Sequence, residues 1–158
     1  MTPAPDSGRL DGGSHLLPIR VYYEDTDAGG IVYHANYLRY AERARSDFLR
    51  LLGLSQLDMK ERLGLGFVVR RLQADYLRSA RLDDALQVVT RVRHLKGASV
   101  CMQQEIRDHE RLLVGLVVDL ALLSFATGRA VRFPADLRAP LLNQLDLPPS
   151  EQDSAWKA

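Results

Sequence analysis

Four strand-like runs joined by short gaps place the strongest constraint on how this chain can fold. The runs are rich in Val, Ile, Leu and Tyr, and they cover residues 67–77, 86–94, 99–107 and 112–125. A parallel crossover needs about a dozen or more residues, and the gaps between these runs are all shorter. The second half of the chain therefore predicts an antiparallel sheet.

One long amphipathic helix precedes these strands. Apolar residues recur at spacings of three and four over 37–52, with charged residues on the opposite side. Asn36 is a suitable N-cap and Gly53 a suitable end. A first strand is expected over 16–23 and a short helix over 55–63. A long helix packed on a curved antiparallel sheet of about five strands is an α+β domain.

The length of 158 residues suits one domain with a single core. Residues 1–15 and 146–158 are rich in Pro, Ser and charged residues, and the first of these stretches also in Gly. This composition predicts a disordered N-terminal tail and a flexible C-terminal tail around a domain over 16–145.

Charge and hydropathy exclude several partners. The formal net charge is +1, with 21 Lys and Arg against 20 Asp and Glu, so no broad field attracts nucleic acid or an anionic membrane. The longest apolar run, 112–125, is interrupted by Asp119 and is too short for a membrane span. The N-terminal residues lack a signal-peptide pattern. We therefore expect a cytoplasmic protein that binds no nucleic acid.

The segment 22–37 carries the candidate chemistry. Asp27 stands just before the adjacent glycines Gly29 and Gly30, and His34 follows near the start of the helix. Glycines let the backbone turn sharply and approach a ligand, while a helix start leaves amide N–H groups unpaired. A carboxylate beside such donors can hydrolyse an ester or thioester, because it activates water or attacks directly while the amides hold the oxyanion.

Other interpretations of these residues stay open from the sequence alone. Asp27 could equally be a turn residue or a helix cap, and His34 an ordinary helix-start histidine. A metal site made of Asp25, Asp27 and His34 would lack a second histidine, so we predict none. The single cysteine, Cys101, lies in a strand-like run and is expected to be a core residue, and no GxSxG nucleophile motif exists.

Taken as a whole, the segment resembles the hotdog-fold acyl-CoA thioesterases. Within them it is similar to the 4-hydroxybenzoyl-CoA thioesterase group and its branch encoded beside the Tol–Pal envelope genes. The resemblance covers about 16–142 and rests mainly on the motif Asp25-Thr26-Asp27-Ala28-Gly29-Gly30 followed by Val32-Tyr33-His34. It implies a hotdog fold and a hydrolase that cleaves acyl-CoA to a free carboxylic acid and coenzyme A.

The resemblance also implies roles for particular residues. The catalytic carboxylate falls on Asp27, as nucleophile or general base, and the amide that polarises the thioester carbonyl falls on His34. Tyr23 corresponds to a tyrosine of the same pocket, and Gly30 and Tyr33 belong to the substrate-binding loop. A second hotdog group carries its carboxylate inside the long helix; the rival base here is Glu42, which we interpret as structural.

Coenzyme A is part of the substrate, and the resemblance implies no metal or redox cofactor. Lys96 matches the family region that approaches the coenzyme A phosphates, and Arg70 and Arg71 are further candidates. The family forms homodimers or homotetramers with active sites at the subunit interface, which would cover the second face of the doubly apolar run 112–125. The alternative function is a non-catalytic module or scaffold, linked to envelope or lipid synthesis, that binds acyl-CoA or acyl-carrier protein.

Overall fold

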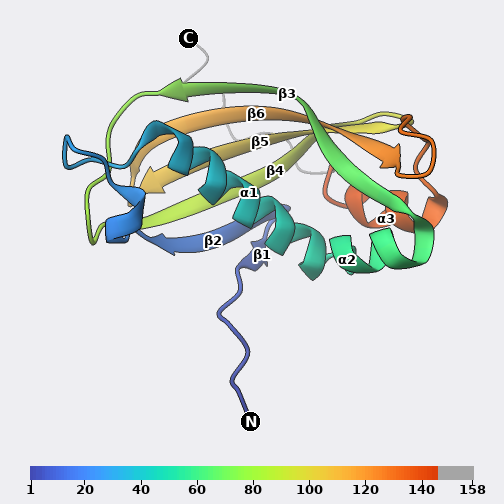
Figure 1. The fold of residues 1–158 in the computed structure, drawn as a ribbon, viewed down its shortest axis with the longest axis horizontal. Coiled ribbons are helices and arrows are strands. Elements are labelled where there is room, and N and C mark those ends of the chain that lie inside the picture. Colours follow the sequence, from blue (N-terminus) through green and yellow to red (C-terminus); the bar gives the residue numbers. More distant parts are fainter. Residues whose placement is uncertain (146–158) are drawn as a thin grey trace.

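The structure, a computed structural model, describes residues 1–145 (Figure 1). The predicted flexible C-terminal tail, 146–158, lies outside the described residues. The helical elements are a short turn η1 (Tyr23–Asp25), α1 (His34–Leu51), α2 (Gln56–Asp58), the π-helical turn η2 (Met59–Leu63) and α3 (Ala135–Leu142). The strands are β1 (Arg9–Asp11), β2 (Ser14–Arg20), β3 (Leu65–Tyr76), β4 (Ala85–Leu95), β5 (Ser99–Asp108) and β6 (Arg111–Ser124).

All strands form one antiparallel sheet in the order β1-β2-β4-β5-β6-β3. The sheet curves, and α1 runs along one of its faces (Figure 1). This is the α+β arrangement that the short gaps and the helical periodicity predicted, and β3 to β6 match the predicted runs to within two residues.

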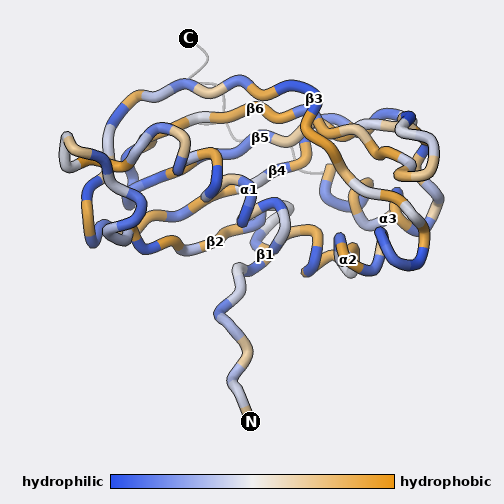
Figure 2. The backbone as a smooth tube through the Cα atoms, in the orientation of Figure 1, coloured by the Kyte–Doolittle hydropathy of each residue, from blue (hydrophilic) through white to orange (hydrophobic). Residues whose placement is uncertain are grey.

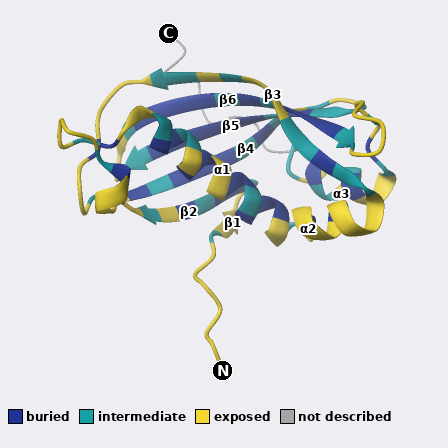
Figure 3. Cartoon of the chain, viewed as in Figure 1, coloured by how far each residue is buried: buried dark blue, intermediate teal, exposed yellow. Residues whose placement is uncertain are grey.

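The core lies between α1 and the strands in the middle of the sheet. Hydrophobic residues recur along these elements (Figure 2), and β4, β5 and β6 are largely buried (Figure 3). Tyr40 and Phe48 of α1 are fully buried against residues such as Met102 and Leu116 of the sheet. Burying one such side chain stabilises the fold by about 1.5–3 kcal/mol, so this seam holds the helix on the sheet.

Within residues 1–145 the sheet has six strands where about five were expected, because β1 forms inside the predicted N-terminal tail. The turn at Gly12 and Gly13, both with positive φ, folds β1 back on β2. His15 is fully buried, and its Nε2 lies 2.7 Å from Asp47 Oδ2 of α1. The ordered part of the chain therefore begins before residue 15, the predicted end of the N-terminal tail. A buried polar contact between His15 and Asp47 holds this segment, and the apolar pattern of the sequence does not reveal such a contact.

Two other boundaries differ from those expected. The first strand ends at Arg20, and Tyr23 belongs to the η1 turn instead. The helix begins at His34, with Tyr33 as its N-cap. Asn36 is therefore inside the helix, where its side chain bonds to the carboxylate of Asp25.

The two ends of the sheet carry different features. The loop 21–33 and the end of β3 lie at one end, and the β4–β5 turn and α3 lie at the other (Figure 1). At the α3 end, Arg138 Nη1 donates to the carbonyl of Lys96 at 2.8 Å, and the Phe133 amide donates to Gly97. None of the helices in residues 1–145 combines the length and apolar character needed to cross a membrane.

Candidate active site

The loop between η1 and α1 is a tight hairpin closed by backbone hydrogen bonds. The Asp27 amide donates to the Ile31 carbonyl at 2.9 Å, and the Gly30 amide donates to the Asp27 carbonyl at 3.0 Å. Gly30 has φ of +76°, a conformation that favours glycine. The hairpin thus holds Asp27 and Gly30 at its exposed tip.

The Asp27 side chain has one oxygen engaged and one open. Its Oδ1 accepts a hydrogen bond of 2.8 Å from the Gly29 amide. None of the hydrogen bonds among residues 1–145 engages Oδ2. A Cβ built on residue 29 would lie only 3.1 Å from Oδ1, so the lack of a side chain at Gly29 lets the Asp27 carboxylate lie close to the Gly29 backbone. The carboxylate is exposed and oriented, as a reacting group should be.

Asp25 is buried at the base of the loop. Its side chain is only 2% exposed; Oδ2 accepts from the Tyr22 amide and Oδ1 from Asn36 Nδ2, both at 2.8 Å. Burial raises the pKa of this carboxyl, but the bonds from Tyr22 and Asn36, the nearby Tyr40 hydroxyl and the Arg43 charge together lower it below the usual range. Asp25 is therefore a buried anchor.

The helix start lies directly after the hairpin. The Tyr33 amide donates to the Asp25 carbonyl at 2.8 Å, which fixes the direction of entry into α1. His34 is the first residue of the helix, so its amide has no carbonyl acceptor within α1. Its imidazole is exposed and packs against the Tyr33 ring, with ring centroids 4.5 Å apart. Within residues 1–145, an amide without an acceptor thus lies next to an exposed imidazole and tyrosine.

Tyr37 joins the helix start to the rest of the site. Its hydroxyl accepts a hydrogen bond of 2.9 Å from the Ala80 amide in the β3–β4 loop. Burial raises the pKa of Tyr37; the Ala80 bond lowers it, and Asp84, Tyr76 and Asp27 raise it further. Asp27 is therefore near enough to act electrostatically on the first turns of α1.

Tyr23 differs from the other candidates. Its side chain is 83% exposed, and no hydrogen bond or ring contact among the described residues joins it to Asp27 or His34. In a single chain, Asp27 and Gly30 lie on the hairpin tip, Tyr33 and His34 lie at the helix start directly after it, and the Tyr23 side chain is exposed to solvent.

Lys96 lies at the opposite end of the sheet, on the β4–β5 turn. It lines a pocket of about 410 Å³ on the sheet, together with Arg70, Arg71, His94, Ser99, Cys101 and Asp119. Asp119 pairs in register with Arg71 and Cys101. The three basic residues proposed from the sequence, Arg70, Arg71 and Lys96, therefore line the same pocket.

Glu42 is placed away from the hairpin. Its Oε2 lies 2.5 Å from Arg45 Nη2, and its Oε1 accepts a hydrogen bond from the Ser46 hydroxyl. Arg45 is buried and also donates to Gln104 of β5 at 2.7 Å. These contacts agree with a structural role for Glu42. Among residues 1–145, no three His, Cys, Asp or Glu side chains gather in a way that could hold a metal ion.

Tyr76 belongs to this region and was not singled out from the sequence. It is the last residue of β3, and its hydroxyl donates to the His34 carbonyl at 3.1 Å. The two residues are 42 positions apart, so no local pattern signals their contact. Only the pairing of β3 along the sheet edge brings them together.

A long helix on a curved antiparallel sheet, with a carboxylate hairpin at the helix N-terminus, defines a hotdog domain of the thioesterase type. The sequence model of the Thioesterase-like superfamily matches residues 21–141. The chain therefore belongs to this superfamily, as its motif suggested.

Individual relatives agree with this assignment. The chain is 43% identical over 130 residues to the acyl-CoA thioesterase YbgC of Haemophilus influenzae, covering 82% of this chain and 95% of that protein. It is 47% identical over 98 residues to the acyl-CoA thioester hydrolase YbgC of Escherichia coli, covering 61% and 72%. A probable thioesterase from Bartonella henselae has a similar structure, with a TM-score of 0.73, 39% identity, and coverage of 77% and 99%.

Proposed function

We propose that this protein is an acyl-CoA thioesterase, which hydrolyses acyl-CoA to a free carboxylic acid and coenzyme A. The observation that carries the proposal is the open oxygen of Asp27 on the hairpin that leads directly into the N-terminus of α1. This arrangement lies in a chain that is 43% identical to a protein named as an acyl-CoA thioesterase. Coenzyme A enters as part of the substrate, and the proposal includes no separate cofactor.

Asp27 acts either as a general base or as a nucleophile. As a general base, it takes a proton from water as the water oxygen attacks the thioester carbon; the C–S bond then breaks, and Asp27 returns the proton to the departing sulfur, which leaves as the coenzyme A thiol. As a nucleophile, it attacks the carbon itself to form a mixed anhydride and expels the coenzyme A thiolate; water then cleaves the anhydride to the free acid and the Asp27 carboxylate, and the proton that this step releases converts the thiolate to the thiol. In either case a negative charge develops on the carbonyl oxygen.

The His34 amide stabilises that charge. It carries no intrahelical bond and stands at the positive end of the helix dipole, so it donates to the oxyanion without rearrangement. Gly30 leaves the tip of the hairpin narrow, and Tyr33 forms an apolar wall beside His34. Tyr23, which extends into solvent, contributes to the pocket only when another surface covers it.

A second copy of the chain supplies that surface. Within residues 1–145, β3 is an edge strand with exposed apolar residues that include Val69, and such an edge pairs readily with another strand. Two copies paired antiparallel through β3 continue one sheet. The functional unit in this proposal is a homodimer, or a homotetramer built from two such dimers.

The antiparallel pairing also explains how Lys96, at the far end of the sheet, takes part in the site. Because a two-fold axis near the middle of β3 reverses the second copy, the α3 end of one chain comes beside the loop end of the other. Lys96 of the partner subunit then lies toward the Asp27 hairpin. In this arrangement the pocket lined by Arg70, Arg71 and Lys96 accepts the phosphates of coenzyme A.

The test is release of free thiol from a panel of acyl-CoAs by wild type and by Asp27→Asn. Asparagine keeps an oxygen that can accept the Gly29 bond, so the hairpin should stay folded while the base or nucleophile is lost. We expect a loss of at least about 100-fold in kcat. Glu24→Gln, which removes an exposed carboxylate from the neighbouring turn, is the matched control.

Two outcomes would overturn the proposal. Equal rates for folded Asp27→Asn and wild type would exclude Asp27 as the catalyst. Tight binding of acyl-CoA or acyl-carrier protein without thiol release would instead identify a binding module.

A further inference from the structure

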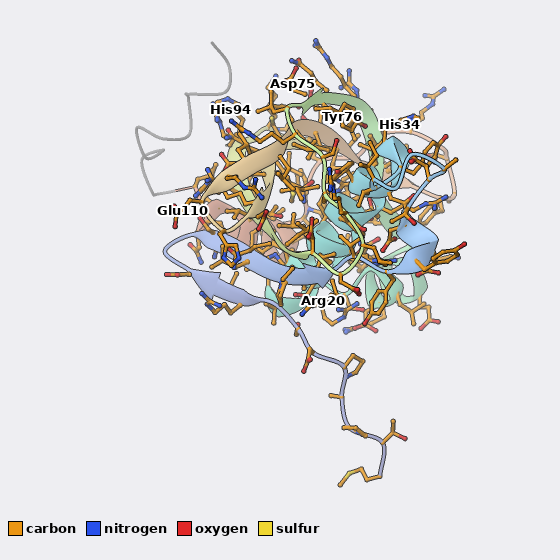
Figure 4. All side chains as sticks on the ribbon, turned by 90° about the vertical axis from the view of Figure 1, so that its left-hand side faces the viewer. Arg20, His34, Asp75, Tyr76, His94 and Glu110 are labelled. Atoms are coloured by element: carbon orange, nitrogen blue, oxygen red, sulfur yellow. The ribbon has the colours of Figure 1, made fainter. Side chains whose placement is uncertain are left out.

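Tyr76 contacts the helix start through both its hydroxyl and its ring. The hydroxyl donates to the His34 carbonyl at 3.1 Å. The ring meets the His34 imidazole edge-on, with centroids 6.3 Å apart and an interplanar angle of 83°, and meets the Tyr37 ring at 5.9 Å and 66°. Figure 4 shows His34 and Tyr76 side by side at this end of the sheet.

These contacts tie two elements that are otherwise weakly joined. Among the hydrogen bonds of residues 1–145, the Tyr76–His34 bond is the one that links β3 to α1. His34 is the first residue of α1, and its carbonyl belongs to the same peptide unit as the Ala35 amide. A bond to this carbonyl therefore restrains the peptide that follows the His34 amide and polarises the Ala35 N–H.

The position of Tyr76 makes this restraint relevant to the reaction. First-turn amides have no partners inside the helix, so their direction depends on what holds the first turn. The amide groups act as oxyanion donors only when they are held in place before the reaction. Tyr76 remains 47% exposed next to the helix start, and burial raises the pKa of its hydroxyl, which therefore stays a neutral donor.

We propose that Tyr76 is a positioning residue of the thioester site: it holds the first turn of α1 against the end of β3 and so aims the His34 amide at the thioester carbonyl. The inference rests on the proposed function and adds to it a residue that does not touch the reacting atoms.

The first experiment compares Tyr76→Phe with wild type in steady-state kinetics. Phenylalanine keeps the ring contacts and removes one hydrogen bond. We expect kcat to fall about three- to tenfold while KM stays within about twofold, because the lost restraint acts on the transition state. Tyr22→Phe removes an exposed hydroxyl from the neighbouring loop and is the matched control. An unchanged kcat for folded Tyr76→Phe would overturn the proposal.

The second experiment does not depend on activity. In ¹H–¹⁵N spectra, the His34 and Ala35 amide resonances should shift in Tyr76→Phe and stay in place in Tyr22→Phe. Unshifted amides in Tyr76→Phe would overturn the positioning role even if kcat falls. A wild-type protein that releases no thiol would overturn the proposed function instead, so the two failures are distinguishable.

Discussion

Asn36 in the first turn of α1 donates a hydrogen bond of 2.8 Å to the buried carboxylate of Asp25 in the η1 turn. This bond joins the two segments that flank the Asp27 hairpin. Since Tyr33 also bonds to the Asp25 carbonyl, the hairpin is closed at its base by Asp25. The position of Asp27 relative to the helix therefore depends on a carboxylate that is not itself exposed to substrate.

Asn36→Ala should weaken both the fold and the activity. The change leaves the buried Asp25 carboxylate short of one donor, which costs about 1–3 kcal/mol. We expect a lower free energy of unfolding in urea and a lower kcat. Gln56→Ala is the control, because it removes an exposed amide bonded to Ser46 and should change stability by less than about 0.5 kcal/mol. Equal losses in the two variants would contradict the anchor role.

The long helix and five of the six strands within residues 1–145 could be predicted because their apolar patterns are strong. β1 could not, since its three residues are all exposed and show no alternation. Asn36 fits the composition of an N-cap, but its side chain bonds instead to Asp25, eleven residues earlier. Such a contact depends on the path of the hairpin, which composition does not specify.

The candidate site was predictable only in part, for a similar reason. Asp27, Gly30 and His34 lie in one short segment, so a motif can carry them together. Tyr76 reaches His34 only through the pairing of β3 with β6, and chain order gives no sign of it. Lys96 was assigned to the same substrate, but within one chain it lies at the other end of the sheet.

Gly30→Ala should reduce activity beyond its effect on stability. Gly30 has φ of +76°, and no described atom lies within 4 Å of a Cβ built there, so the cost is backbone strain of about 1–2 kcal/mol. Gly53 is a matched control, because its φ is +78° and its surroundings are equally open. Similar losses in unfolding free energy are expected for both variants, with a marked loss of kcat/KM for Gly30→Ala alone. A comparable kinetic loss in Gly53→Ala would show that strain at the hairpin has no specific effect.

His15 should make stability depend on pH between neutral and mildly acidic conditions. Burial lowers the pKa of His15 below its ordinary value of 6.5, although the hydrogen bond and charge of Asp47 oppose this. The unfolded chain therefore takes up a proton first as pH falls through 6.5, and stability is lost below that pH. Asp47, whose pKa is lowered below 3.8 despite its burial, adds a loss only at more acidic pH.

Urea unfolding from pH 8 down to about pH 5.5 measures this effect. For one group, the slope is at most about 1.4 kcal/mol per pH unit. His15→Gln should flatten the dependence, whereas His109→Gln, at an exposed histidine, should leave it unchanged. A slope in His15→Gln equal to that of wild type would assign the pH dependence to other groups.

Lys96 should serve the active site of the partner subunit. Lys96→Ala is expected to raise KM for acyl-CoA by about fivefold with little change in kcat, since an exposed cation–phosphate contact is worth up to about 1 kcal/mol.

A heterodimer of one Asp27→Asn chain and one Lys96→Ala chain distinguishes sites that are shared between subunits from sites formed within one chain. If the sites are shared between subunits, one site combines both changes and the other has wild-type Asp27 and wild-type Lys96. The purified, differently tagged heterodimer should then show the wild-type KM at half the wild-type kcat per dimer. If each chain forms its own site, the only active site lacks Lys96, and the raised KM of Lys96→Ala persists.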